Sequence, residues 1–194
     1  MACKLTANIT NEACEYALAG IIAIYLANYY TPSVVTTLPT DPVAGVISYT
    51  QNVDGEVTGI QLPDGENLYK VDITEGSGSF ADQLLAGGSG GKYRQHQVAG
   101  NIPVLNKDIL GGDADALSLG RFIAIVETAK GFFMLGRRGG LTAPANGVDY
   151  ASGAAAADAN GWTLSLQGST IEMMRPVLAS IIPALLVPAD EVTP

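Results

Sequence analysis

Charged side chains are scarce in this sequence. Asp, Glu, Lys and Arg together make up 15% of its 194 residues, whereas hydrophobic residues make up 47%. A soluble monomer usually carries charges on about a quarter of its residues. The length suits one domain, or one domain with arms. We therefore expect the chain to hide more surface than a monomer can, through contacts with further copies of itself.

Cations are the scarcer charges, with 10 Lys and Arg against 19 Asp and Glu and a formal net charge of −9. Binding of nucleic acid through a basic surface needs a cluster of cations that neutralises phosphates. The field of this protein is expected to repel DNA instead, which suits a wall along which DNA slides.

Histidine and cysteine are nearly absent. His96 is the single histidine and lies in a polar run, 92–97, without a carboxylate neighbour in the sequence. A lone histidine is most often a surface or core side chain. Cys3 and Cys14 cannot complete a tetrahedral zinc site with one histidine, and they are either two plain thiols or a disulfide that pins the N-terminal arm. We expect no enzyme, no cofactor and no metal site.

A glycine-rich segment, 86–93, has part of the spacing of a phosphate-binding loop. Ala86 stands at the first glycine position, and Tyr93 stands where a hydroxyl would hold magnesium. A strand is expected to follow, so the dipole of a helix N-terminus is missing as well. The segment therefore predicts no phosphate site.

Long hydrophobic runs are also missing. The apolar stretches 20–27 and 177–188 are shorter than the roughly 20 residues of a membrane-spanning helix. The first residues lack the apolar core of a secretory signal. We expect a soluble protein made in the cytoplasm, with no membrane partner.

The clearest structural signal is a pair of apolar runs, 121–128 and 131–136, joined by Ala-Lys-Gly. The pair predicts a β-hairpin, because glycine supplies the positive φ of a tight turn. In the first run Phe122, Ala124 and Val126 alternate with Ile123 and Ile125. A strand that is apolar on both faces must be covered on both faces, and a second subunit is the expected cover for one of them.

The rest of the chain predicts a mainly β (α+β) fold: an antiparallel β-sandwich or barrel with one or two short helices, extended loops and arms. Asp-Gly turns predict a three-stranded meander over 46–74, and Gly/Ser-rich pieces predict a flexible loop over 75–91. Prolines predict an extended segment over 31–45. The other expected elements are strands 21–29, 92–105 and 161–168, a helix over 114–119 and a loop over 141–160.

Three regions are expected along the chain. Residues 1–20 form an N-terminal arm with a short helix, residues 21–175 form the β-sandwich assembly domain, and residues 176–194 form an apolar C-terminal arm. Prolines at 176, 183 and 188 oppose a long helix in that arm, so we expect it to pack on a neighbouring copy.

The order of these elements resembles tail-tube proteins of tailed bacteriophages and related ring proteins. The resemblance rests on the hairpin, Gly139-Gly-Leu141, Asp158-Ala-Asn-Gly161, the strand 162–168 and the apolar tail. The pattern Cys3…Cys14 followed by 20–29 is similar to structural proteins of phages of gut Bacteroidales. The resemblance to tail-tube proteins implies a virion tail protein that forms hexameric rings. These rings would stack into a tube, with other virion proteins as partners and DNA as passing cargo.

The segments 31–42 and 75–91 depart from this pattern, so a neck or tail-terminator ring is an alternative. A β-sandwich adhesin or decoration module is another, with Tyr25, Tyr29 and Tyr30 as candidate binding aromatics. For the assembly interface, the expected contacts are hairpin isoleucines, an apolar knob in the 75–91 loop and an arginine pair that forms inter-subunit salt bridges. These residues are Ile123, Ile125, Phe80, Leu84, Leu85, Arg137 and Arg138.

Overall fold

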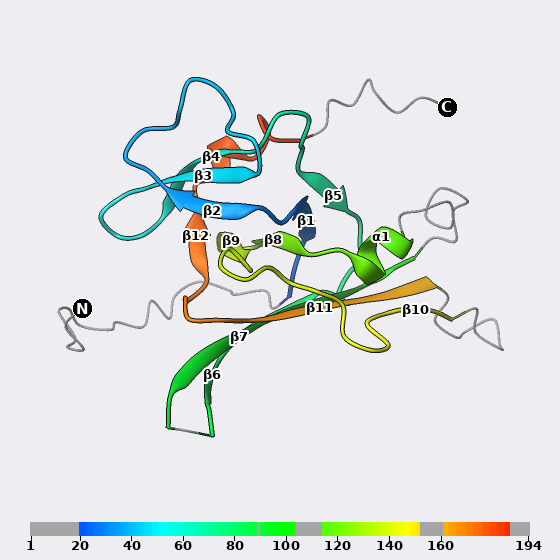
Figure 1. Cartoon of the computed structure of the whole chain (residues 1–194). Helices are drawn as coiled ribbons and strands as arrows, with labels where there is room; N and C mark the ends of the chain where they lie inside the picture. The colour runs from blue at the N-terminus through cyan, green and yellow to red at the C-terminus, as the bar shows by residue number, and fades with distance from the viewer. Residues whose placement is uncertain (1–19, 89, 104–113, 152–160, 187–194) are drawn as a thin grey trace, which may run out of the picture.

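Two β-sheets organise the chain (Figure 1), and the computed structural model describes residues 20–88, 90–103, 114–151 and 161–186. The large sheet has the order β2-β3-β4-β12-β9-β8-β1-β5, and the small sheet has the order β10-β11-β7-β6. The strands of the large sheet are β1 (Ala23–Asn28), β2 (Thr31–Val34), β3 (Val46–Gln51), β4 (Val57–Gln61), β5 (Tyr69–Val71), β8 (Phe122–Thr128), β9 (Gly131–Leu135) and β12 (Arg175–Val177). Those of the small sheet are β6 (Ser79–Ala86), β7 (Lys92–Ile102), β10 (Val148–Ala151) and β11 (Gly161–Thr170).

The mainly β prediction is confirmed, and the large sheet curls into a half-barrel. The expected helix is present as α1 (Ala114–Leu119), and a 3₁₀ turn, η2 (Ala179–Ile181), follows β12. Two strand pairs, β2 with β3 and β12 with β4, are parallel within an otherwise antiparallel arrangement. The predicted N-terminal arm with its helix, and both cysteines, lie outside the described residues.

The concave side of the large sheet encloses one apolar cluster, the inner core. Strands far apart in the sheet order contribute to it, because the curl brings β3 and β4 over β1 and β8. Its largest fully buried side chains are Tyr49, Ile47 and Met134.

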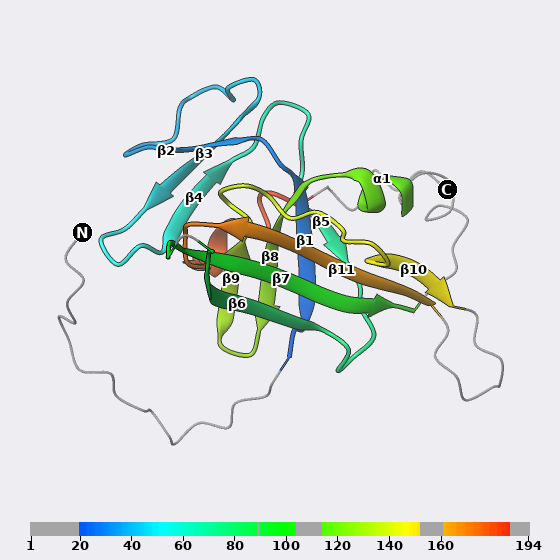
Figure 2. The same ribbon diagram turned by 60° about the horizontal axis from the view of Figure 1, so that its bottom comes forward.

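The small sheet packs across the other side of β1, β8 and β9, as Figure 2 shows. A second apolar cluster, the intersheet core, fills the space between the two layers. Val98 of β7 and Leu164 and Leu166 of β11 meet Ile24 and Val126 of the large sheet there. Alternation along β11 therefore places its leucines inward, as the sequence predicts.

The predicted hairpin is confirmed as β8 and β9, with Val126 opposite Phe133. Both faces of β8 are indeed covered, but the same chain covers them. Ile123 and Ile125 lie in the inner core at 3% and 2% exposure, while Phe122, Ala124 and Val126 lie in the intersheet core. The expectation that a neighbouring copy covers Ile123 and Ile125 is wrong, because the curl of the large sheet already does so.

The three-stranded meander is only partly correct. β3 and β4 form the expected hairpin, with Tyr49 opposite Ile60. β5 instead crosses to the far edge of the sheet and pairs with β1, Val71 opposite Ile24. β12 pairs with the edge of β4 that β5 was expected to occupy. The turn residues between β4 and β5 could not predict this, because β12 lies far away in the sequence.

The middle of the predicted flexible loop 75–91 is a strand, β6, paired with β7 over its whole length. The glycine before it serves close packing, since a Cβ on Gly78 would lie 2.4 Å from a methyl carbon of Ile73. Phe80 is anchored by stacking on Phe133, with ring centres 6.0 Å apart. Similarly, the predicted loop 141–160 contains β10, which pairs with β11.

The expected C-terminal arm begins inside the fold. β12 lies between β4 and β9, and Val177 and Ile182 are buried in the inner core. The Leu68 amide donates to the Leu185 carbonyl oxygen at 2.8 Å, which closes the open end of the curl. Residues 176–186 thus pack within the domain rather than forming a separate arm.

Truncation of Ile125 tests this account of the inner core. Ile125→Ala removes buried methyl groups from a packed cluster, and we expect the free energy of unfolding to fall by about 2–5 kcal/mol. Ile22→Ala is the matched control, because Ile22 is 61% exposed and its loss leaves no cavity. Urea unfolding followed by tryptophan fluorescence measures both; equal effects of the two substitutions would contradict the assignment.

Candidate assembly surface

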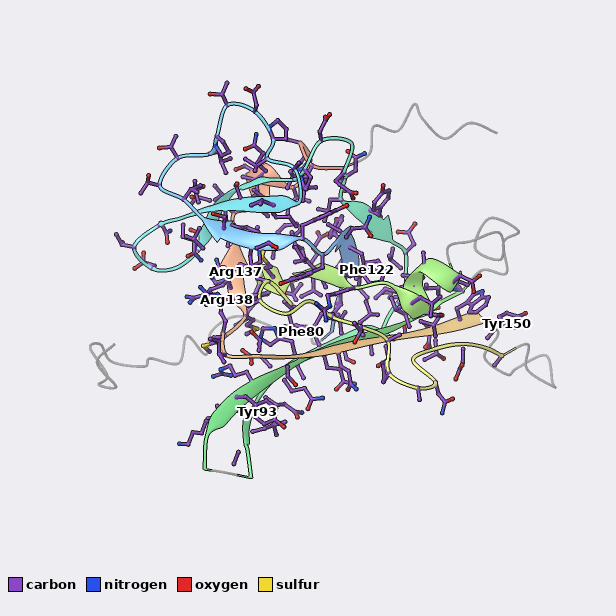
Figure 3. The ribbon with its side chains drawn as sticks, viewed as in Figure 1. Phe80, Tyr93, Phe122, Arg137, Arg138 and Tyr150 are labelled. Atoms are coloured by element: carbon purple, nitrogen blue, oxygen red, sulfur yellow. The ribbon has the colours of Figure 1, made fainter. Side chains whose placement is uncertain are left out.

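The structure disperses the predicted interface residues over three places. Ile123 and Ile125 lie in the inner core and reach no surface. Phe80, Leu84 and Leu85 share the edge strand β6, and Arg137 and Arg138 follow β9. In Figure 3 the hairpin of β6 and β7, which carries Tyr93, projects from the body of the molecule. The open side of β6 is therefore the candidate surface.

The backbone of β6 presents alternate peptide groups to this open edge. The Gly87 amide donates to the Gly91 carbonyl at 2.6 Å, in the same register that pairs β6 with β7. The Gly78 carbonyl, one residue out of phase, points away from β7 and accepts from Ile21. Because backbone groups of alternate residues point the same way in a strand, the even-numbered residues face the edge. These residues are Phe80, Asp82 and Leu84.

Within the described part of the chain no strand pairs with that edge. An unpaired edge of eight residues is a ready template for another strand, and proteins usually shield such edges with charges, prolines or short length. β6 is not short and contains no proline. Its single charged side chain, Asp82, points into the protein and leaves the open edge unshielded. Leu84 adds an apolar side chain that is 57% exposed.

The outer face of the small sheet is almost uncharged. The strand registers place amide, hydroxyl and small side chains on it, and the sheet covers its other face with the intersheet core. The face consists of Ser79, Ala81, Gln83, Leu85, Tyr93, Gln95, Gln97, Ala99, Asn101, Asp149, Thr163, Ser165, Gln167 and Ser169. The Gln95 amide donates to the Gln167 side-chain oxygen at 3.1 Å, which links neighbouring strands. Lys and Arg are missing from these positions.

A buried polar cluster fixes the root of the hairpin. Asp82 accepts hydrogen bonds from Arg94 at 2.8 Å and from the Met174 amide at 3.0 Å. His96 lies opposite Asp82 on β7, with its Nε2 3.5 Å from the carboxylate and its Nδ1 accepting from the Gly136 amide at 3.0 Å. The cluster joins β6 and β7 to the ends of β9 and β11.

The geometry favours a neutral imidazole at His96. Its Nδ1 accepts a hydrogen bond, so the ring proton sits on Nε2, facing Asp82. Burial lowers the pKa of His96 below 6.5, and this effect outweighs the attraction of Asp82, while Arg94 lowers it further. His96 has no carboxylate neighbour in the sequence, but the strand pairing supplies one, because Asp82 lies opposite it on β6.

An arginine cluster lies beside this root. Arg137 and Glu172 are both nearly buried and form a bidentate pair, with Arg137 Nε 2.9 Å from one carboxylate oxygen and Nη2 against the other. Burial alone would raise the pKa of Glu172, but hydrogen bonds and charges from Arg137 and Arg175 hold it below its ordinary value. The Arg137 guanidinium also lies 5.6 Å from the ring centre of Tyr49.

The two predicted interface arginines therefore have different roles. The prediction that Arg137 pairs with another subunit is wrong, because Glu172 of the same chain takes its hydrogen bonds. Arg138 has an exposed side chain, and its Nε lies 4.0 Å from a carboxylate oxygen of Glu172, which is the outer limit of an ion pair. Of the pair, Arg138 is the residue available at the surface.

The tyrosines of the alternative binding module belong to the fold. Tyr25 is buried and donates to Glu127 at 2.8 Å, and burial followed by this carboxylate raises its pKa to about 12. Tyr29 and Tyr30 are half-buried against the inner core. Tyr30 donates to Glu66 at 2.6 Å, and the Arg121 guanidinium lies 5.4 Å from the Tyr29 ring centre. They do not form an exposed aromatic platform.

Among the described residues, no group of three or more metal-ligating side chains is present, and no helix has the length and apolarity needed to cross a membrane. Comparison with known proteins gives no match: no family model, no curated protein and no solved structure is similar to this chain. The proposals below therefore rest on the geometry of the chain itself and on the resemblance described above.

Sequence reasoning missed the uncharged face and the polar root. Alternation over 93–101 and 163–169 does contain the first signal, since every second residue there is an amide, a hydroxyl or a small side chain. The polar root, which is the buried cluster at the base of the β6–β7 hairpin, joins Asp82, His96 and the Met174 amide from separate segments. No local pattern predicts that meeting.

Titration of His96 is expected to govern stability near neutral pH. Its pKa is lowered in the folded state, so the unfolded chain binds the extra proton and the free energy of unfolding falls as pH drops below 6.5 towards that lowered pKa. His96→Asn keeps an acceptor but does not titrate, so the slope in this window should disappear. Thermal unfolding at several pH values measures it. As the chain has one histidine and its carboxyl groups titrate at lower pH, a slope just below pH 6.5 that persists in the variant would contradict this account.

Arg137 and Arg138 form a matched pair for mutation. Arg137→Ala leaves the buried carboxylate of Glu172 with weaker compensation, and we expect the free energy of unfolding to fall by roughly 3–5 kcal/mol. Arg138→Ala removes an exposed charge and should change it by less than about 0.5 kcal/mol. Chemical denaturation measures both values; a stable Arg137→Ala protein would show that the pair is dispensable.

Proposed function

We propose that this protein is a virion structural protein that assembles into rings, hexameric by the resemblance, which stack as a phage tail tube for the passage of DNA. The observation that carries the proposal is the small sheet. It combines an open edge at β6 with an outer face free of Lys and Arg. Both properties belong to the same four strands, as a tube wall requires.

Pairing between copies follows from the strand directions. Every neighbouring pair in the small sheet is antiparallel, and the sheet has an even number of strands. When two copies have the same orientation, β6 of one copy therefore runs antiparallel to β10 of the next. The contact is heterologous, and repetition with a rotation that closes gives a ring whose small sheets form one continuous wall. Closure also removes the edges that an isolated copy exposes.

The uncharged face then lines the lumen. Phosphate groups gain affinity from Lys and Arg through counterion release, and the positions on this face offer neither residue. Amides and hydroxyls keep the wall hydrated, while the net charge of −9 repels the DNA backbone. DNA passes such a surface without being held.

Assembly is tested through the β6 backbone. The Leu84 amide points to the open edge, so Leu84→Pro removes a donor for a neighbouring strand and no hydrogen bond to β7. We expect the variant to remain folded but to lose rings and tubes in size-exclusion chromatography with light scattering and in negative-stain electron microscopy. The wild-type protein should form particles many times the 20.0 kDa mass of one chain.

Leu84→Ala is the control, because it keeps the amide and shortens the exposed side chain. It should assemble like the wild-type chain. Wild-type protein that stays monomeric at high concentration and at every salt concentration would overturn the proposed function. Normal rings from Leu84→Pro would overturn the role of the β6 edge.

A further inference from the structure

Charges are distributed unevenly along the strands of the small sheet. At the end where β6 meets β7 and where β11 finishes, here called the hairpin end, the strand ends and the segments that continue them carry five cations and two carboxylates, and the turn between β3 and β4 adds two carboxylates beside Arg175. The cations are Lys92, Arg94, Arg137, Arg138 and Arg175, and the two carboxylates of these segments are Asp82 and Glu172. Half of the 10 Lys and Arg of the whole sequence therefore gather at one end.

The exposed cations of the hairpin end are Lys92 and Arg138. Arg94 and Arg137 are engaged with the two carboxylates, and Arg175 also binds Glu172, at 3.2 Å. The turn between β3 and β4 reaches the Arg175 side chain through Gly55, which brings Asp54 and Glu56 to that side. The most weakly paired cations are Lys92, which has no ion pair among the described residues, and Arg138, which is 56% exposed and lies 4.0 Å from Glu172.

Exposed apolar side chains lie at the same end of the sheet. Leu84 faces Arg94 across the hairpin, and Ile171 and Met173 flank Glu172. All three are more than half exposed. A surface that joins exposed apolar groups to weakly paired cations fits a partner with apolar groups and carboxylates.

The opposite end of the small sheet, here called the helix end, has that complementary character. Asp149 lies on β10, Asp115 on α1 beside it, and Glu75 in the segment that joins Asn101 of β7 through Thr74. Leu119, at the end of α1, is the most exposed leucine among the described residues, at 87%. In Figure 3 Tyr150 marks this end, and Arg137 and Arg138 lie towards the other.

We propose that the hairpin end of one copy docks on the helix end of a second copy, so that copies associate head to tail along the strands of the small sheet. A second copy is the occupant that the charges favour, because each subunit carries both halves of the complementary pair. The contact is separate from edge pairing, which runs across the strands. Given the proposed rings, it is the contact that stacks them.

Charge reversal at the hairpin end tests this proposal. Lys92→Glu/Arg138→Glu replaces both exposed cations and should yield single rings in negative-stain micrographs where the wild-type chain yields tubes. Wild-type tubes should also separate into rings as salt rises, since screening shortens to about 3 Å at 1 M. Lys130→Glu is the matched control, because Lys130 is exposed at the turn between β8 and β9 and should leave the tubes intact.

Rescue makes the test specific. Glu75→Lys/Asp115→Lys reverses the helix end and should likewise give single rings, while a mixture of the two double variants should form tubes of alternating rings. Tubes from Lys92→Glu/Arg138→Glu at normal yield, or a mixture without tubes, would overturn the inference. Retention of DNA by wild-type protein, lost in the Lys92→Glu/Arg138→Glu variant, would also overturn it, by assigning the cations to phosphate.

This inference rests on the proposed function but fails separately from it. Rings without salt-sensitive stacking would contradict the docking of the two ends and leave ring formation standing. A wild-type chain without any assembly would contradict the proposed function first.

Discussion

The pairing of β1 with β8 is the constraint on which the fold depends. The two strands exchange hydrogen bonds from Ala23–Glu127 to Asn28–Phe122, and their side chains are apolar on both faces. One face closes the inner core and the other closes the intersheet core. Burial of both faces costs no peptide hydrogen bonds, since the ladder satisfies them. Strands from both sheets pack on one or the other face of this central pair.

The sequence predicted local structure better than long-range pairing. The hairpin of β8 and β9, the strand β11 and helix α1 follow from alternation and turn residues such as Lys130-Gly131. The pairing of β5 with β1 and the position of β12 between β4 and β9 do not follow from such local signals. Both depend on which of several distant strands pairs with a given strand edge. The burial of both faces of β8 was also predictable from its apolar residues. What covers each face was not, because a curled sheet and a second subunit bury a strand equally well.

The candidate surface was foreseen in part. Leu84 and Arg138 are exposed as an interface requires, whereas Phe80 and Arg137 are committed to contacts within the chain. Phe80 and Arg137 differ from Leu84 and Arg138 because they have partners within the chain, Phe133 and Glu172. Residue spacing in the sequence does not predict these partners. The uncharged outer face and the polar root give the small sheet two unlike sides. One side bears no Lys or Arg, and the other holds the hairpin in a fixed direction.

The separation of β1 from β8 along the chain has a consequence for biosynthesis. Tyr25 and Glu127 are 102 residues apart, and β12 enters between β4 and β9 only after residue 175 has been made. Contacts so distant in sequence make folding slow, because loops must close before the pairing rewards them. Because β7 pairs with β11 as well as with β6, the small sheet is complete only after residue 170 has been made. The order of synthesis therefore leaves one edge of β4, β7 and β9 unpaired until β11 and β12 arrive, and unpaired strand edges are the parts of an incomplete fold most prone to association.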